Sequence, residues 1–266
     1  MTSPEISVIM SVYNTERYLE ESIKSILNQT FKNFEFLIVD DKSSDGSLNI
    51  LKRYSLIDKR IQIFENPKNV GLTKNLNFLI LKSKGRFIAR MDADDISLND
   101  RLEKQREYLS KNQVDLIGSS SIEIDGNGQK IAIKRYPLTH KAVMKKSLKA
   151  CPILHPTVFA KAKVFKENHY DENYKTCQDL ELWFRLLKKG VIIENISEPL
   201  LLFRRDNEFL KRRGLKKGIL ELRIYFKGIW DLKPFSAAYI FPIARLIIRA
   251  FPSWALKIIY NSKIRL

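Results

Sequence analysis

The chain has 266 residues, of which 44% are hydrophobic, so it can bury a sizeable core and is not expected to be disordered. Its 47 lysines and arginines against 30 acidic residues give a net charge of +17, which favours an anionic partner: nucleic acid, a phosphorylated substrate or an anionic membrane surface. Cys151 and Cys177 form neither a CxxC pair nor a secretory disulfide framework, which indicates free thiols in a reducing compartment.

The N-terminal sequence MTSPEISVIMSVYN lacks the basic segment, apolar run and small-residue cleavage site of a signal peptide. The most membrane-like region, residues 235–266, is interrupted by basic residues and by Pro242 and Pro252. No uncharged run in it reaches the roughly 18 residues that span a bilayer. This region is therefore expected to lie on a membrane surface at most, and not to cross it.

In the first part of the chain, apolar runs typical of buried strands alternate with segments whose apolar residues recur at helical spacing. Strands are expected at residues 6–14, 34–40, 60–65 and 86–91, and helices at 15–29, 48–55 and 72–85. This alternation predicts a doubly wound, mostly parallel α/β sheet. Ligands bind beyond the carboxyl ends of such strands, and the first, second and fourth strands end in the polar sequences SVYN, DDKSSD and DADD.

The pattern changes after the fourth strand. A helix is expected at 99–112, two strands within 114–136 around an Asp-Gly-Asn-Gly turn, and a further helix at 178–190. The two strands suit a mixed or antiparallel extension of the sheet. From Arg204 onward there are 15 basic residues and four acidic ones, with large apolar residues interleaved at helical spacing. This predicts amphipathic helices at the C-terminus.

Asp92, Asp94 and Asp95 crowd three carboxylates at the end of the fourth strand of a basic protein. Carboxylates at i and i+2 after a strand suit a hard cation such as Mg²⁺ or Mn²⁺, whose open positions can bridge to phosphate oxygens. The alternative is that one acid caps the following helix while the others are solvated. The two interpretations are compatible if Asp95 or Asp100 caps the helix and Asp94 binds the metal.

Five segments occur in an order that resembles the family 2 glycosyltransferases: SVIMSVYN, QTFKNFEFLIVDDKSSDGS, NVGLTKNLN, GRFIARMDADD and QDLELWFRL. The resemblance covers roughly residues 5 to 205. It implies the GT-A nucleotide-diphospho-sugar transferase fold and the transfer of a sugar from a nucleotide donor. It says almost nothing about which sugar is transferred.

The resemblance assigns a nucleotide site. Tyr13, with Ser11 in the same SVYN segment, matches the loop that packs on the nucleotide base, and the alternative is an ordinary aromatic at a strand end. Asp41 matches a carboxylate that accepts a hydrogen bond from uracil, which implies a UDP donor. Its neighbours Asp40 and Asp45 are expected to organise the turn. Lys74 is either a contact to the phosphates or base, or a solvated helix lysine.

The resemblance also assigns the metal and the base. Asp94 matches the ligand of Mn²⁺ or Mg²⁺, with Asp92 nearer the ribose or the water shell of the metal. Asp179 matches the aspartate that acts as the base and removes the acceptor hydroxyl proton in an inverting single displacement. The alternative for Asp179 is a helix N-terminal acid whose pKa the macrodipole lowers, unless apolar neighbours such as Trp183 offset that effect. The chain departs from the family at Gln178, where the family has Glu.

Four further residues are weaker candidates for contact with the acceptor or the diphosphate. His155 stands between two acceptor-side segments, although a lone histidine is more often structural. Trp183 can stack on an acceptor sugar or fill the core, and its spacing favours the core. Arg204 and Arg205 resemble residues of the family's mobile loop that close on the diphosphate, or else form a basic surface strand.

The expected organisation is a GT-A domain at 1–205, with a donor half at about 1–97 and an acceptor half at about 98–205, followed by a basic amphipathic tail at 206–266. The tail has three interpretations: a solvated helical surface, a nucleic-acid site, or a helix pair on an anionic leaflet. Its large aliphatic residues favour the leaflet, and no usual nucleic-acid motif appears. Attachment to the inner face of a bacterial cytoplasmic membrane would place the protein beside a lipid-diphosphate-linked acceptor.

The sequence thus predicts an inverting, metal-dependent glycosyltransferase that transfers a sugar from a UDP-sugar to a lipid-linked glycan in O-antigen, capsule or exopolysaccharide assembly. A sugar-phosphate nucleotidyltransferase would need a Gly-rich loop after the first strand, and a dinucleotide or methyl-donor enzyme a G-x-G turn there; SVYNTE has no glycine. The remaining alternative is a membrane-docked module that binds UDP without transfer, which only Gln178 favours.

Overall fold

The computed structural model describes residues 3–205 and 215–249. In these ranges the strands are β1 (Ile6–Val12), β2 (Phe34–Asp40), β3 (Ile61–Glu65), β4 (Phe87–Asp92), β5 (Ile96–Ser97), β6 (Leu116–Ile124), β7 (Lys130–Lys134), β8 (Phe159–Lys161) and β9 (Ile193–Arg204). The helices are α1 (Glu16–Leu27), α2 (Ser47–Ile57), α3 (Leu72–Lys82), α4 (Arg101–Lys111), α5 (His140–Ser147), α6 (Ala162–Glu167), α7 (Gln178–Lys188), α9 (Leu215–Leu232) and α10 (Ile240–Arg249). Two 3-10 turns, η1 (His155–Thr157) and η2 (Ala237–Tyr239), complete the set.

The strands form one sheet in the order β3-β2-β1-β4-β8-β6-β9-β5, with β7 paired to β6 outside this path. Its first half is parallel, because β1 pairs in parallel with both β2 and β4, and β2 with β3. Strand β1 alternates between the two faces: Val8 and Met10 join the core beneath α1, α2 and α4, whereas Ile9 joins the core beneath α3, α6 and α7. The predicted doubly wound sheet is therefore confirmed.

The second half is the predicted mixed extension. Strand β8 is antiparallel to both β4 and β6, and β6 runs parallel to β9. Strands β6 and β7 form the expected hairpin around the turn at residues 125–128. Strand β5 directly follows the acidic sequence DADD and pairs antiparallel with Leu201 and Leu202 of β9. That pairing ties the loop after β4 to the end of the last strand.

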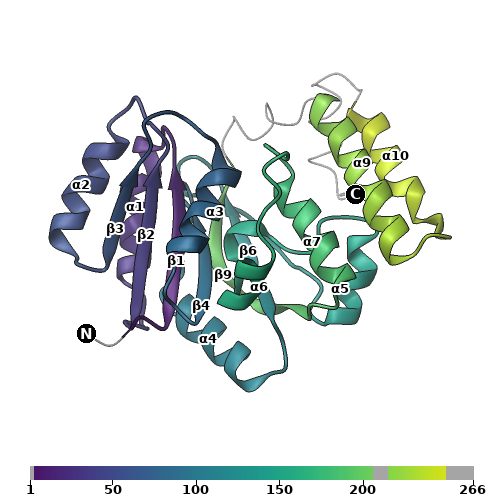
Figure 1. The fold of residues 1–266 in the computed structure, drawn as a ribbon, viewed down its shortest axis with the longest axis horizontal. Coiled ribbons are helices and arrows are strands. Elements are labelled where there is room, and N and C mark those ends of the chain that lie inside the picture. Colours follow the sequence, from purple (N-terminus) through teal and green to yellow (C-terminus); the bar gives the residue numbers. More distant parts are fainter. Residues whose placement is uncertain (1–2, 206–214, 250–266) are drawn as a thin grey trace.

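The C-terminal helices α9 and α10 lie beside α7, at the end of the molecule away from β3 (Figure 1). A shared apolar cluster joins Leu180 and Phe184 of α7 to Ile224, Tyr225 and Ile229 of α9. The division of the chain after residue 205 stays a prediction, but α9 packs on the preceding part of the chain. No helix among residues 3–205 and 215–249 is long and apolar enough to cross a membrane.

Candidate active site

Asp92, Asp94 and Asp95 form an acidic cluster at the carboxyl end of β4, and one oxygen from each lies within 4.8 Å of the others. Asp92 and Asp94 are half-buried, whereas Asp95 is 1% exposed. The seryl Oγ of Ser22 on α1 donates to the Asp92 carbonyl at 2.9 Å and fixes the start of this turn. All three acids lie where a ligand of a parallel sheet is expected to bind.

A buried arginine neutralises the first acid of the cluster. The Arg90 guanidinium makes a two-pronged ion pair with the Asp92 carboxylate, with Nη1 2.8 Å from Oδ2 and Nη2 bonded to Oδ1. Arg90 is 3% exposed and precedes Asp92 by two residues, so the two side chains share one face of β4. Behind them Arg101, fully buried on α4, donates from Nη2 to the Arg90 carbonyl at 2.8 Å.

Arg204, at the end of β9, holds the other two acids. Its backbone N–H donates to Asp95 Oδ1 and its Nε donates to the Asp94 carbonyl, both at 2.9 Å. Its Nη2 pairs with Glu21 Oε2 at 2.6 Å, and its guanidinium lies 4.2 Å from the ring centre of Tyr18. Because Arg204 is 5% exposed and bonds to both the acidic turn and α1, it clamps the acidic turn from inside.

The expectation that Arg204 or Arg205 closes over a diphosphate stays a prediction, which the burial of Arg204 does not favour. Arg205 Nη1 lies 2.8 Å from Glu123 Oε2, so both arginines pair with carboxylates of the protein. The pairing of β9 with β6 places Arg204 in the core. The basic sequence FRR does not predict this pairing. The segment FRRDNE (203–208) resembles the family's mobile loop, and its residues 206–208 lie outside the described residues.

The crowding of the acids changes their protonation. Burial, reinforced by the neighbouring carboxylates Asp94 and Asp92, raises the pKa of Asp95 well above its usual range. Burial lowers the pKa of Arg101 to about 9, so this side chain is still a cation at neutral pH. The buried Oδ2 of Asp95 has no hydrogen-bond partner. An oxygen-only donor set with an unsatisfied buried oxygen fits a hard divalent cation, which would relieve the mutual repulsion of the acids.

Neither Asp95 nor Asp100 caps a helix, contrary to the alternative considered from the sequence. Asp100 stands at the N-cap position of α4, but its side chain makes no capping bond and instead pairs with Lys104 Nζ at 2.6 Å. Asp95 is bonded to Arg204 on β9. All three acids of the DADD turn therefore remain in one cluster.

The ends of β1 and β2 lie beside this cluster, because β1 is paired with both β2 and β4. Asp41 is 2% exposed, and its carboxylate accepts from Asn66 Nδ2, Val70 N and Gly71 N at 2.8 to 2.9 Å. These bonds tie the end of β2 to the start of α3. Oδ2 carries one of the three bonds and so has a lone pair left to accept from a further donor.

The other nucleotide-site candidates differ in exposure. Ser11 accepts from Asn75 Nδ2 at 3.0 Å and so belongs to the support of the site. Tyr13 is 50% exposed at the end of β1, and Lys74 is exposed on the first turn of α3. An exposed aromatic ring can stack on a base and an exposed ammonium can meet a phosphate.

Asp40 and Asp45 organise the turn after β2, as expected. Asp40 Oδ2 accepts from the Ser43 backbone at 3.0 Å. Asp45 accepts from the backbone of Glu16 and of Ser47, each at 3.0 Å. The first of these bonds fastens the turn to the start of α1.

Asp179 is the second residue of α7 and is half-buried. Burial raises its pKa, while a backbone hydrogen bond from Leu180 and the positive charges of Arg90 and Lys217 act in the opposite direction. Desolvation is the largest of these effects, so the pKa of Asp179 is raised in spite of its place at a helix N-terminus. A half-buried carboxyl with a raised pKa is suited to accept a proton. Gln178 beside it is buried at 6% exposure.

His155 and Trp183 lie in the core. His155 is 7% exposed, its Nε2 is 2.7 Å from the Tyr170 hydroxyl, and burial lowers its pKa well below the usual range. Trp183 is 0% exposed and packs edge-on to His155, with ring centres 5.8 Å apart. Trp183 therefore cannot stack on an acceptor in this arrangement, and both side chains favour the structural alternatives.

The two cysteines are unpaired thiols. Burial raises the pKa of Cys151 to about 12 and that of Cys177 to about 11, so neither is a thiolate near neutral pH. Cys177 has a left-handed backbone, with φ of 60°, and precedes Asp179 by two residues. Nucleophilic catalysis by these thiols is not supported.

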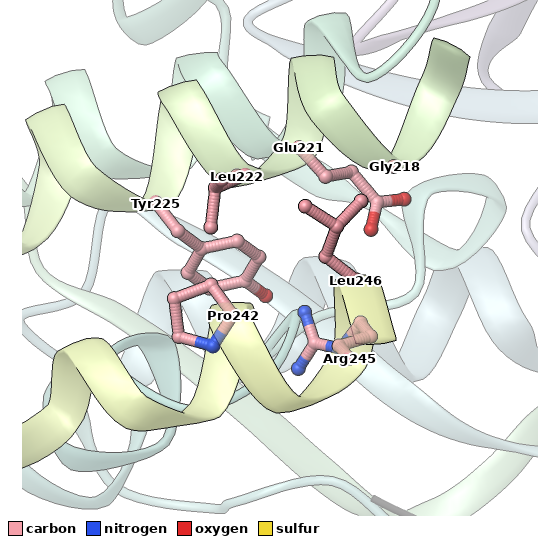
Figure 2. Close-up of a pocket in the computed structure, with 7 residues that line it drawn as sticks. All are labelled: Gly218, Glu221, Leu222, Tyr225, Pro242, Arg245 and Leu246. Atoms are coloured by element: carbon pink, nitrogen blue, oxygen red, sulfur yellow. The ribbon is translucent and has the colours of Figure 1, made fainter. Parts of the chain in front are cut away.

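A shallow pocket lies between α9 and α10 (Figure 2). It is lined by Gly218, Glu221, Leu222, Tyr225, Pro242, Arg245 and Leu246. Arg245 lies over the Tyr225 ring at 4.8 Å from its centre. The pocket contains none of the residues assigned to the donor site.

Sequence reasoning missed the positive charges that support the acidic cluster. The spacing of two residues between Arg90 and Asp92 on an expected strand was a usable signal for their pairing. No comparable signal linked Arg101 or Arg204 to the cluster, since Arg204 lies more than 100 residues away along the chain. Asp95 was counted among the three crowded acids, but its expected role was a possible helix cap and not a metal ligand, whereas it belongs to the cluster.

Comparison with known proteins shows the family of the chain and agrees with its fold. Residues 7–168 match the family described as Glycosyl transferase family 2. The chain is 34% identical to "Putative glycosyltransferase EpsE" of Bacillus subtilis, over 98% of this chain and 95% of that protein. It is 35% identical to "O-antigen biosynthesis glycosyltransferase WbnJ" of Escherichia coli, over 79% of this chain and 83% of that protein.

Two solved structures share the fold. TarS of S. aureus in complex with UDP superposes with a TM-score of 0.69 at 19% identity, over 98% of this chain and 76% of that one. The mannosyltransferase PcManGT of Pyrobaculum calidifontis, in complex with GDP-Man and Mn²⁺, superposes with a TM-score of 0.65 at 17% identity, over 98% and 80%. With its mixed, mostly parallel sheet and a family match over more than half its length, the chain belongs to glycosyltransferase family 2 and is a glycosyltransferase of the GT-A fold.

Proposed function

We propose that the protein transfers a sugar from a UDP-sugar to a lipid-linked glycan acceptor during assembly of a bacterial surface polysaccharide, with inversion at the anomeric carbon. The observation that carries the proposal is the acidic cluster at the end of β4, which lies beside the polar ends of β1 and β2. TarS binds UDP and UDP-GlcNAc on the same fold, whereas PcManGT binds GDP-Man. The match of Asp41 to a uracil-binding carboxylate favours UDP for this chain.

The donor is proposed to bind across the ends of β1, β2 and β4. Tyr13 stacks on the base, Asp41 accepts from its N–H through the remaining lone pair on Oδ2, and Lys74 meets the phosphates. Asp94 would hold Mn²⁺ or Mg²⁺, and Asp92 would contribute through the water shell because Arg90 already pairs with its carboxylate. A cation held by these residues would supply positive charge to the leaving diphosphate.

The transfer step needs a base. Asp179 takes the proton of the acceptor hydroxyl, whose oxygen forms a bond to the anomeric carbon as the bond from that carbon to the diphosphate breaks. The leaving UDP keeps the electron pair, so charges balance and one displacement inverts the anomeric centre. A raised pKa makes Asp179 a stronger base than an exposed aspartate.

The polysaccharide setting is supported by the name of the relative WbnJ, an O-antigen biosynthesis enzyme. An acceptor carried on a lipid diphosphate would require the protein to work at the inner face of the cytoplasmic membrane. The basic C-terminal helices favour this location.

Titration calorimetry of the purified full chain with UDP, GDP, CDP and a short DNA duplex, with and without Mn²⁺, tests the donor class. Tightest binding of UDP, strengthened by Mn²⁺, would support the proposal and direct a screen of UDP-sugars. Preference for GDP would mean that the donor is a GDP-sugar and not a UDP-sugar. Tighter binding of DNA would reject the interpretation that the basic charge serves a membrane surface. Binding of UDP-sugars without any turnover on lipid-linked acceptors would favour a binding module, the alternative that Gln178 raises.

A further inference from the structure

Helix α9 has two different faces. Its buried residues Gly218, Ile224, Tyr225, Gly228 and Ile229 lie on one side, and three of them join the apolar cluster with α7. The opposite side exposes large apolar side chains at helical spacing: Leu215 at 51%, Ile219 at 41%, Phe226 at 38% and Trp230 at 62%. An apolar stripe of this size on the solvent side of a packed helix indicates a binding surface.

Helix α10 exposes a similar stripe. Ile240, Ile243 and Ile247, at i, i+3 and i+7, are exposed by 63%, 42% and 58%. The side of α10 that faces α9 carries Pro242, Arg245 and Leu246 (Figure 2). Phe235, 95% exposed, lies in the short connection between the two helices.

The two stripes lie on the same side of the helix pair. On α9 the stripe is rotated by roughly a quarter of a turn from Gly218, Leu222 and Tyr225, which face α10. On α10 it is rotated by roughly a third of a turn, in the same sense, from Pro242 and Leu246. In a hairpin the second helix runs back along the first, so rotations of the same sense from the shared contact bring both stripes to one face. We call this surface, with Phe235, the apolar hairpin face.

The charges around the apolar hairpin face have one sign. Lys216, Arg223, Lys227 and Lys233 are exposed on and just after α9. The two acids of residues 215–248 are half-buried: Asp231 pairs with Lys188 at 2.7 Å, and Glu221 lines the pocket between the helices. In the described part of the hairpin, the exposed charged side chains are therefore all basic.

We propose that the apolar hairpin face docks on an anionic lipid bilayer, with its apolar side chains in the interfacial layer and the lysines and arginines on the headgroups. Interleaved Trp, Phe and Ile with Lys and Arg on one side of a helix pair is the pattern of an interfacial helix. A nucleic acid would use the charges and leave the apolar stripes exposed. A second copy of this chain could cover the apolar side chains, and it would then appear as a dimer in solution.

The docking would also orient the active site. Helix α7 lies on the other side of α9, and Glu221 Oε1 on α9 is 3.9 Å from Cys177 Sγ, two residues before Asp179. The base would therefore lie about one helix diameter, on the order of 10 Å, from the lipid-facing surface. This consequence rests on the proposed function, because it matters only if the acceptor is carried on lipid.

Co-sedimentation of the full chain with vesicles tests the proposal. Vesicles of equal phosphatidylglycerol and phosphatidylcholine should bind the protein at least tenfold more tightly than vesicles of phosphatidylcholine alone. The double variant Trp230→Ser/Ile243→Ser should lose binding to both. The double variant Arg223→Gln/Lys227→Gln should lose about tenfold or more on the anionic vesicles only, since each surface cation contributes to attraction by the leaflet.

The control is Leu56→Ser/Ile57→Ser, which removes two apolar side chains exposed by 89% and 70% on α2 and should leave vesicle binding unchanged. Equal binding by the wild type and both hairpin variants, or no preference for anionic lipid, would overturn the proposal. A wild-type protein that is a dimer, with a monomeric Trp230→Ser/Ile243→Ser variant, would also overturn the proposal, because the face would then join two copies.

Calorimetry with UDP and Mn²⁺ on the same variants separates the two proposals. Unchanged nucleotide binding with lost vesicle binding supports docking, whereas absent nucleotide binding in the wild type rejects only the proposed function.

Discussion

Three arginines explain how three carboxylates can crowd together at the end of β4. Arg90 pairs with Asp92, Arg204 bonds to the backbone of the acidic turn, and Arg101 lies buried behind them. Buried charges are tolerated only when they are paired and hydrogen-bonded. The cluster is thus balanced from behind, and its half-buried acids Asp92 and Asp94 could hold a metal ion.

Asp94→Asn should weaken Mn²⁺ binding by more than about tenfold. Loss of a partner that only supports a metal ligand already costs on the order of tenfold to a hundredfold in affinity, and loss of a ligand should cost at least as much. Calorimetric titration of Mn²⁺ in the presence of UDP measures the change. Full Mn²⁺ affinity in this variant would contradict the assignment of Asp94.

Arg204→Lys should lower Mn²⁺ affinity by about tenfold while the protein stays folded. A lysine keeps the charge but cannot donate at once to the Asp94 carbonyl and to Glu21, so the acidic turn loosens. The matched control is Arg60→Lys, whose guanidinium pairs with Asp58 at 2.7 Å away from the cluster. If both variants lower Mn²⁺ affinity equally, the loss does not come from the bonds that Arg204 makes to the acidic turn.

Asp179→Asn should retain UDP and Mn²⁺ binding and lower the transfer rate by roughly 10²- to 10⁴-fold, the usual contribution of a positioned base. The base must be ionised to act, so the wild-type rate should fall as the pH drops through its pKa. Because burial raises that pKa, the fall should begin at a higher pH than for an exposed aspartate. A pH–rate profile measures the limb, and the same limb in Asp179→Asn would show that another group titrates.

At the scale of elements, long periodic segments were predicted and short ones were not. Strand β2 begins and ends at the expected residues 34 and 40, and the helix expected at 178–190 is α7. Strand β8 has three residues and α6 has six, too few for a period to show. Strand β9 is stabilised by pairing with β6 and β5, contacts that its own sequence does not encode.

The contact between α7 and α9 depends on one glycine. A Cβ on Gly228 would lie 2.2 Å from two ring atoms of Phe184, so Gly228→Ala should lower the free energy of unfolding by about 1–3 kcal/mol through overpacking. Urea denaturation measures the loss. Phe184→Leu in the same chain should recover part of it, and strictly additive losses in the double variant would mean that the two side chains do not meet.

At the scale of the whole molecule, the C-terminal helices are part of the packed structure as well as a basic surface. A chain that ends after Arg205 would expose Leu180 and Phe184, which are now 5% exposed. Large side chains of this kind each contribute about 1.5–3 kcal/mol when fully buried, so the shortened chain should unfold at a lower urea concentration and aggregate. Equal stability of the two chains would show that residues 206–266 form an independent unit.

The sequence alone determined the order of strands and helices in the first half, the polar strand ends, the acid pair Asp92 and Asp94, and the position of Asp179 at a helix start. These features are local, because hydrophobic period and residue type are read within a few neighbouring residues. Only the tertiary structure decided the roles of residues that meet across the chain. In the structure Arg204 lies inside the acidic turn and His155 and Trp183 lie in the core. Helix α9 packs one face on α7 and exposes the other to solvent. Burial and pairing depend on contacts between distant residues, and no pattern within a single segment specifies them.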